Sequence, residues 1–262
     1  MTTPFSIATW NIHKGFSNFN RRMMVHELRD RLRSLNADIV FLQEVQGLHL
    51  KHAARHAHWP PEPQHEFLAA DVWHSHAYGQ NVVYDHGHHG NAILSRFPIL
   101  HEHNQDVTHL RFERRGLLHC MVDLPQLTHP LHCVCVHLSL FARSRRWQLG
   151  ELADYIDAAT PPDAPLLVAG DFNDWRNHAG EILARRLGLH EVFIHADVHG
   201  NAHPSRSYPA TLPLFRLDRI YQRGLIVDAA HCHSGPPWSK ISDHAALSAT
   251  LSIAARSPLG VT

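Results

Sequence analysis

The sequence lacks three features that would place the protein in a specialised class. No stretch approaches about 18 consecutive apolar residues, so we expect no transmembrane helix. Only four cysteines occur in 262 residues and none forms a C-x-x-C pair, which predicts neither a disulfide framework nor a zinc site. Lysine plus arginine equal aspartate plus glutamate at 24 each, so no net basic charge attracts nucleic acid non-specifically.

The amino-terminal segment MTTPFSIATWNIHKG also lacks the charged start and long apolar centre of a secretory signal. We therefore predict a cytoplasmic protein. Cys133 and Cys135 alternate in LHCVCVHL and share one face of a predicted strand, so we expect buried, reduced thiols. With 44% hydrophobic and 18% charged residues the composition is globular, and we interpret residues 1–262 as a single domain, with a monomer favoured.

Histidine, by contrast, is abundant, with 27 residues. Because the ordinary pKa of histidine is about 6.5, moderate acidification would make the protein strongly cationic. Many of the histidines lie in two runs, HLKHAARHAH at 49–58 and HGHH at 86–89. We interpret both runs as exposed and solvated, with weak adventitious binding of Ni²⁺ or Zn²⁺ as the alternative.

Hydrophobic periodicity predicts a strand–helix–strand unit that occurs twice. The first unit has a strand over 5–10, an amphipathic helix over 22–36 with Asn20 as its N-cap, and a buried strand over 38–45. The second has a strand over 131–140, a helix over 144–158 and a buried strand from Leu166 that breaks at Gly170. The repetition suggests two related halves. The other predicted elements are a short helix at 47–58, a loop at 58–64, strands at 79–85, 90–99 and 117–124, a helix at 177–187, the run 217–224 and a closing strand within 242–251.

Polar side chains end or follow nearly every apolar run. In LLVAGDFNDW, at 166–175, the strand delivers an aspartate and an asparagine, whose oxygens suit a Mg²⁺-type ion, a water or a phosphate oxygen. Burying such groups costs desolvation free energy unless they are paired or bind a ligand. The residues in these positions are Asn11, Glu44, His137, Asp171, Asn173, Asp218, Asp243 and His244.

Each of these residues also has a purely structural interpretation when it is taken alone. The segment after Gly170 is compatible with a local Asx turn. Glu44 is compatible with a buried ion pair, His137 with a satisfied core histidine, and Asp218 with a salt bridge to Arg219. Because strand ends converge in space, so many polar residues together favour a functional site.

These residues lie in an ordered series of motifs that resembles the endonuclease/exonuclease/phosphatase superfamily. Its members include exonuclease III-like nucleases, deoxyribonuclease I, neutral sphingomyelinases, inositol-polyphosphate 5-phosphatases and tyrosyl-DNA phosphodiesterases. The resemblance implies a DNase I-like α/β (α+β) fold, a four-layer α/β sandwich of two packed mixed β-sheets flanked by helices. The motifs are TWNIH at Asn11, LQEV at Glu44, GNAILSR from Gly90, VHLS at His137, GDFN at Asp171 and Asn173, LDRIY at Asp218, and SDH at Asp243 and His244.

The resemblance implies a metal-dependent hydrolase of phosphate esters, with phosphodiesters favoured. Glu44 would be the principal ligand of Mg²⁺, with Mn²⁺ as a substitute, and Asn11 and Asp243 would complete the metal set. The alternative is a non-catalytic domain that keeps the fold and binds a phosphate ligand.

The remaining motif residues would be catalytic by the same resemblance. Asp171 would activate the attacking water, and Asn173 would hold that water or a phosphoryl oxygen. His244 and His137, where protonated, would stabilise the transition state, and Asp218 would orient one histidine and raise its pKa.

Substrate-binding residues are predicted around this set. They are Asn11, Asn173 and His137, together with Arg145 as a cation for phosphates and Trp175 as a wall for a base or an acyl chain. Abasic-site nucleases usually carry a tyrosine-containing motif where this chain has His137, which argues against that activity. The substrate partner stays open between nucleic acid and a phospholipid or small phosphate ester.

Overall fold

The computed structural model describes residues 3–17, 21–176, 178–194 and 205–253, and in it the strands form two six-stranded sheets. The first sheet has the order β11-β12-β1-β2-β4-β3. Its strands are β1 (Phe5–Asn11), β2 (Ile39–His49), β3 (Ser75–Tyr84), β4 (Gly87–Ser95), β11 (Leu225–His233) and β12 (Ala246–Ile253).

The second sheet has the order β5-β6-β7-β8-β10-β9. Both sheets are mixed, because β1 and β2 are parallel, as are β7 and β8, while the other pairs are antiparallel. The strands of the second sheet are β5 (Ile99–Asp106), β6 (Gly116–Val122), β7 (Leu131–His137), β8 (Leu166–Asp171), β9 (His190–Glu191) and β10 (Asp218–Arg223).

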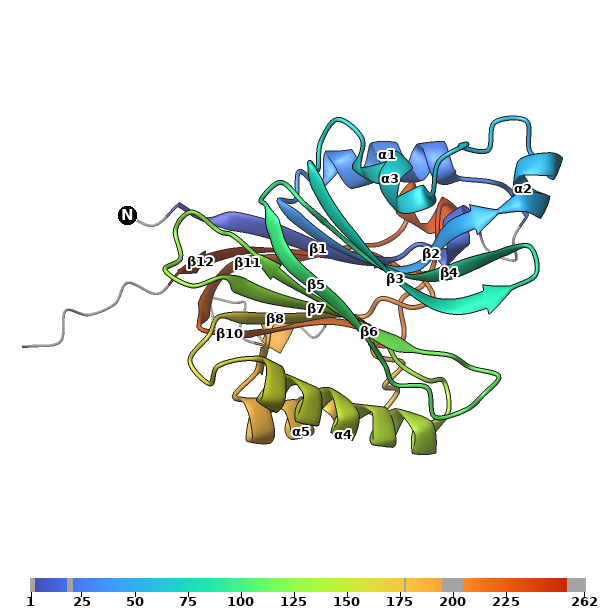
Figure 1. Cartoon of the computed structure of the whole chain (residues 1–262). Helices are drawn as coiled ribbons and strands as arrows, with labels where there is room; N and C mark the ends of the chain where they lie inside the picture. Colours follow the sequence, from blue (N-terminus) through green and yellow to red (C-terminus); the bar gives the residue numbers. More distant parts are fainter. Residues whose placement is uncertain (1–2, 18–20, 177, 195–204, 254–262) are drawn as a thin grey trace, which may run out of the picture.

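Helices cover the outer faces of the two stacked sheets (Figure 1), which confirms the predicted four-layer sandwich. α1 and α3 lie on the first sheet and α4 and α5 on the second, while α2 lies beyond the end of β2. The helices are α1 (Val25–Ser34), α2 (Leu50–Arg55), α3 (Gln64–Ala69), α4 (Ala142–Ala159) and α5 (His178–Leu187), with 3₁₀ turns η1 (His13–Gly15), η3 (Val192–Ile194) and η4 (Trp238–Lys240).

The period-two alternation of each strand supplies two apolar faces. In β8, Leu167 and Ala169 pack in the core between the sheets, whereas Leu166 and Val168 pack against the outer helices. Because both faces of the central strands are covered, such strands are nearly continuous runs of apolar residues. Both cysteines of LHCVCVHL lie in the core between the sheets as free thiols, as predicted.

The predicted strand–helix–strand units are present as β1-α1-β2 and β7-α4-β8. Helix α1 is shorter than predicted, and its N-cap is Met24; Asn20 lies outside the described residues. β2 runs on to His49, so helix α2 is half the predicted length. Strands β5 and β11 and helix α3 were not predicted. The two strands lie at sheet edges with mostly half-buried or exposed side chains, so their sequences lack a clear apolar alternation.

Across the described ranges, none of the helices combines the length and apolar character needed to cross a membrane.

Gly170 offers a test of how tightly β7 and β8 pack beside the last residue of β8. Its φ is +144°, and a Cβ there would lie 2.0 Å from the Val136 carbonyl oxygen. We expect Gly170→Ala to lower the free energy of unfolding by about 2–4 kcal/mol in urea titration, because the clash is with backbone. Gly150→Ala is the matched control, since a Cβ there meets nothing within 4 Å in the middle of α4. The control should gain about 0.5–1 kcal/mol, and equal effects at both positions would contradict this account.

Candidate active site

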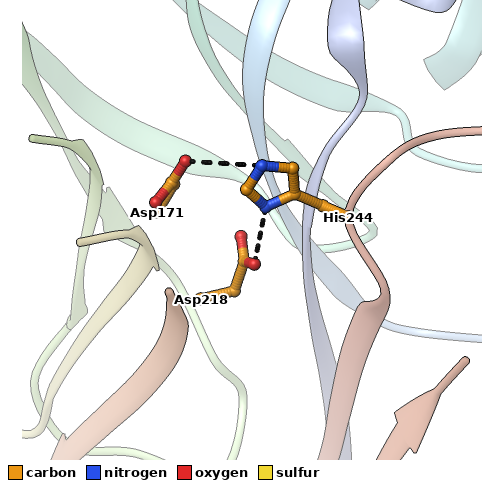
Figure 2. Close-up of side chains that lie close together, drawn as sticks. All are labelled: Asp171, Asp218 and His244. Carbon is orange, nitrogen blue, oxygen red and sulfur yellow. Dashed lines mark hydrogen bonds and ion pairs between the residues drawn. The ribbon is translucent and has the colours of Figure 1, made fainter. Parts of the chain in front are cut away.

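Titratable side chains from three adjacent strands meet at one end of the second sheet. The register aligns His137 of β7 with Asp171 of β8, and Asp171 with Asp218 of β10. His244 comes from the turn before β12, and so from the other sheet. Figure 2 shows His244 lying between the two aspartates. The site is therefore formed where the two sheets come together.

A hydrogen bond joins His244 to Asp218. The Nδ1 atom of His244 lies 2.8 Å from Asp218 Oδ2, and its Nε2 lies 3.9 Å from Asp171 Oδ2 (Figure 2). The indole of Trp10 donates a 2.8 Å hydrogen bond to the His244 carbonyl oxygen, and Ser242 Oγ accepts from the His244 amide at 3.2 Å. These backbone contacts hold the imidazole between the two carboxyl groups.

The neighbouring charges shift the pKa values of this cluster. Burial by itself would lower the pKa of His244, but the charge and hydrogen bond of Asp218 outweigh burial and raise it to about 10. Burial raises the pKa of Asp171 to about 6, although the charge of His244 opposes the shift. At neutral pH the cluster thus contains an imidazolium beside a carboxylate that can accept a proton close to that pH.

His137 lies next to the carboxylate of Asp171 too, but its pKa is shifted in the opposite direction from that of His244. Its Nε2 is 3.6 Å from Asp171 Oδ2. Burial, together with the charges of Arg115 and His244, lowers the pKa of His137 well below its usual value. The two histidines were expected to act where protonated; the lowered pKa of His137 favours its neutral form, whereas that of His244 favours the imidazolium.

Two asparagines hold Asp171 from either side. Asn11 Nδ2 donates to Asp171 Oδ2 at 3.1 Å, and the backbone amide of Asn173 donates to Asp171 Oδ1 at 2.9 Å. Asn173 has a φ of +49°, and its Nδ2 donates to the Leu138 carbonyl oxygen at 2.9 Å. The left-handed backbone at Asn173 turns the chain after β8 so that it wraps the aspartate.

Glu44 reaches the site because β2 contains a bulge. The pairing of β2 with β4 shifts between Leu42 and Val45, and Glu44 has a φ of +57°. A bulge re-aims a side chain that regular alternation would send elsewhere. The side chain of Glu44 is 22% exposed, and its Oε2 lies 3.5 Å from Lys14 Nζ.

Cations from turn η1 keep two acidic groups ionised. His13 Nδ1 lies 3.1 Å from Asp243 Oδ1. Burial alone would raise the pKa of Glu44, but the charges of Lys14 and His13 hold it below its usual value. Burial would likewise raise the pKa of Asp243, but the hydrogen bond from His13 and the charge of His244 lower it. The two carboxylates are therefore negative and available to a cation.

The oxygens of Glu44, Asp243 and Asn11 fit a hard divalent cation such as Mg²⁺ or Mn²⁺. Asn11 Oδ1 accepts a 3.1 Å hydrogen bond from the His13 amide, so it faces the η1 side of the site. Asp171, Asp218 and His244 also offer ligand atoms within 4.8 Å of one another. That second group fits a metal poorly, because His244 is bonded to Asp218 and protonated, and an imidazolium offers no lone pair.

Arg145 and Trp175 occupy different kinds of position. Arg145 is 5% exposed, and its Nη1 donates to the carbonyl oxygens of Ser139 and Leu140 at 2.9 and 3.0 Å. These contacts brace the loop after β7. Trp175 is 41% exposed, and its ring centroid lies 4.8 Å from that of Phe215. Trp175 therefore belongs to an exposed aromatic rim.

Residues that the sequence interpretation did not place in the site support its loops. Arg219 pairs with Glu191 at 3.4 Å and with Asp174 at 3.6 Å, and donates to the Asp174 carbonyl at 3.0 Å. Asp218, which the sequence left open to a local pair with Arg219, bonds to His244. His13 was also missed as a site residue; its only sequence signal is the position of HKG directly after TWNI.

Comparison with known protein sequences agrees with this geometry. A model of the Endonuclease/Exonuclease/phosphatase family matches residues 8–244. The uncharacterized protein YbhP of Escherichia coli K12 is 46% identical over 247 residues, which cover 94% of this chain and 96% of YbhP.

Solved structures share the fold. An endonuclease/exonuclease/phosphatase from Beutenbergia cavernae DSM 12333 superposes with a TM-score of 0.76 at 19% identity, over 95% of this chain and 72% of that one. D. rerio TDP2 complexed with single-strand DNA product gives a TM-score of 0.68 at 21% identity, over 95% of this chain and 99% of that one. At these identities the likeness concerns the fold alone.

The Asp218–His244 pair can be tested in metal-free protein by NMR. We expect the His244 ring to titrate near pH 10 and to move towards about 6.5 in Asp218→Asn. The raised folded-state pKa means that the pair stabilises the fold below about pH 6.5 and that this contribution is lost as pH rises through about 10. Asp218→Asn should therefore destabilise more at pH 7 than above pH 10.

Asp123→Asn, which changes an exposed carboxylate between β6 and β7, is the control and should leave the His244 titration in place. A wild-type His244 that titrates near pH 6.5 would refute the charge state assigned to it.

Proposed function

Because this chain belongs to the endonuclease/exonuclease/phosphatase family, we propose that it is a divalent-metal-dependent phosphoesterase. Phosphodiesters are favoured over monoesters, and Mg²⁺ is the proposed metal, with Mn²⁺ as a substitute. We also propose that residues 1–262 make up one catalytic domain. The core between the sheets supports this, because it contains residues of both sheets, for example Phe41 and Leu167.

The observation that carries the proposal is the buried Asp218–His244–Asp171 cluster, which lies beside the ionised carboxylates of Glu44 and Asp243. In this cluster the protonated imidazole of His244, a hydrogen-bond donor, lies 3.9 Å from Asp171, which can accept a proton. Phosphoester hydrolysis needs both, because the attacking water must lose a proton while negative charge on the phosphoryl oxygens is stabilised.

In the proposed reaction a water attacks phosphorus in line with the leaving oxygen. Asp171 accepts the proton of that water as its oxygen bonds to phosphorus and the bond to the leaving oxygen breaks. His244 donates a hydrogen bond from Nε2–H to a phosphoryl oxygen, and Asp218 keeps the imidazole charged and oriented. A cation held by Glu44, Asn11 and Asp243 would polarise the phosphoryl oxygen and stabilise the leaving oxyanion.

The other site residues position these groups. Asn11 is proposed to serve both ends of the site, since its Nδ2 binds Asp171 while its Oδ1 faces η1. Asn173 and neutral His137 would hold the water or a phosphoryl oxygen. Trp175 would contact the substrate outside the phosphate, and Arg145 would support the adjoining loop.

Two substrate classes are compatible with this chemistry. The first is nucleic acid, and the second comprises phospholipids and small phosphate esters. The net charge of zero disfavours non-specific duplex DNA, which is bound through many phosphate contacts. The similarly folded D. rerio TDP2 was solved with a single-strand DNA product, which makes single strands worth testing here. A non-catalytic phosphate-binding role is the alternative, and turnover distinguishes the two.

Metal dependence is the first test. We expect hydrolysis of bis-p-nitrophenyl phosphate to stop in EDTA and to return with Mg²⁺ or Mn²⁺. Glu44→Gln should weaken Mn²⁺ binding, measured by water proton relaxation, as well as turnover, because it removes a negative ligand. Glu102→Gln changes an exposed glutamate of β5 and should match wild type in both measurements. Full turnover in chelator would rule out the metal-dependent mechanism.

The role of Asp171 is tested by Asp171→Asn. We expect kcat to fall about 10²–10⁴-fold while Mn²⁺ binding persists, because the amide cannot take the proton of the attacking water. Thermal melting checks that the variant is folded. An Asp171→Asn variant that keeps wild-type activity would show that another group is the base. In the wild-type protein, hydrolysis of the diester and not of p-nitrophenyl phosphate would identify a diesterase.

A further inference from the structure

A cavity lies beside Glu44, the proposed principal metal ligand. Its volume is about 440 Å³, and its walls come from η1, the end of β2, α2 and the strands β3 and β4. Lys14 lines this cavity and also lies 3.5 Å from Glu44. A ligand in the cavity would therefore lie next to the place proposed for the reacting phosphate. None of the roles proposed for the active site uses this space.

Aromatic rings form a continuous wall along the cavity. The centroid distances between successive rings, from Phe16 to His52 to His49 to Tyr84 to His89, are 4.8, 3.6, 5.6 and 5.9 Å. These rings come from segments far apart in the sequence, and all of them line the cavity. A series of rings this close offers faces on which a planar ligand can stack.

The rings of this wall include members of both histidine runs. The runs were interpreted as exposed and solvated, but His49, His52 and His89 are only partly exposed and line the cavity. Burial, together with the charges of His49 and His56, lowers the pKa of His52 to about 4. Burial, together with Lys14, also lowers the pKa of His89 to about 4. The wall is therefore an uncharged aromatic surface at neutral pH.

We propose that this cavity binds the nucleobase of a nucleotidyl phosphodiester whose phosphate lies at the neighbouring acidic site. The proposal rests on the phosphoesterase function proposed above and names its substrate class. In proteins that bind single-stranded nucleic acid, bases stack on aromatic side chains while cationic groups contact the phosphates. Lys14 and Arg55 line the same cavity and supply the cations that adjacent phosphates require.

The polar lining of the cavity favours a base over an acyl chain. Lys14, Gln46 and Arg55 line it beside the rings. An acyl chain would bury these groups without a partner, whereas a base edge carries donors and acceptors that can pair with them. His49 Nδ1 is already occupied, since it accepts from the His52 amide at 3.1 Å.

A transition metal is the competing occupant of a histidine cluster. Within the described part of the chain, the one group of three or more candidate ligands with atoms within 4.8 Å is Asp171, Asp218 and His244. The histidines of this cavity instead present their rings to one another, with His49 and His52 stacked at an interplanar angle of 28°. The geometry therefore favours stacking over chelation.

Binding to metal-free protein tests the cavity without turnover. Isothermal titration compares thymidine 5′-monophosphate with ribose 5-phosphate, which lacks the base. We expect the nucleotide to bind more tightly, and His52→Ala and Tyr84→Ala to raise its Kd roughly 5- to 150-fold, the range of one lost base stack. His52→Phe keeps a ring and should retain most of the affinity. His129→Ala, an exposed histidine between β6 and β7, is the matched control.

Kinetics with Mg²⁺ then separate this proposal from the proposed function. Thymidine 5′-(p-nitrophenyl phosphate) and methyl p-nitrophenyl phosphate release the same leaving group. We expect the kcat/KM ratio of the first to the second to exceed one and to fall roughly 5- to 150-fold in His52→Ala and Tyr84→Ala. Failure to cleave either ester while the nucleotide still binds would refute the phosphoesterase function and leave the base site standing.

Three outcomes would overturn the base site itself. The first is equal binding of thymidine 5′-monophosphate and ribose 5-phosphate. The second is a kcat/KM ratio that the two alanine variants leave as it is in folded protein. The third is stoichiometric binding of Zn²⁺ or Ni²⁺ that is lost in His52→Ala, in protein that shows no preference for the nucleotide.

Discussion

The site depends on one constraint, which is that charges buried at the edge where two sheets meet must satisfy one another. His244 and Asp218 do so through a 2.8 Å hydrogen bond that links a turn of the first sheet to a strand of the second. Removing either partner would leave an uncompensated buried charge. The pair therefore joins the two sheets and at the same time holds an imidazolium 3.9 Å from Asp171.

Local irregularities of the backbone direct the side chains towards this edge. A bulge turns Glu44 towards the site, and a left-handed residue at Asn173 wraps the chain around Asp171. The strands that carry these irregularities are packed on both faces, so the hydrophobic core fixes their conformation. Turn η1 adds His13 and Lys14, which balance the acidic groups. This arrangement pre-organises the site before any ligand binds.

The acidic site and the aromatic cavity are neighbours that share Lys14. Phosphate chemistry and base recognition place different demands on a protein, since the first needs charge and the second needs uncharged rings. In this protein the charged groups and the uncharged rings lie in two neighbouring sites. Motif residues at the strand ends carry the charge, and histidines kept neutral by burial supply the rings of the cavity.

The sequence by itself determined the two strand–helix–strand units and the set of residues at the strand ends, because periodicity and short motifs are local properties. The sandwich followed only from the resemblance of its motifs to a known family. It could not reveal the edge strands β5 and β11, whose burial pattern is weak. Only the tertiary structure decided that His244 is charged and His137 neutral, that Arg145 braces a loop, and that the histidine runs line a cavity with Phe16. Charge state and ring contact depend on burial and on neighbours from distant segments, and folding alone brings these together.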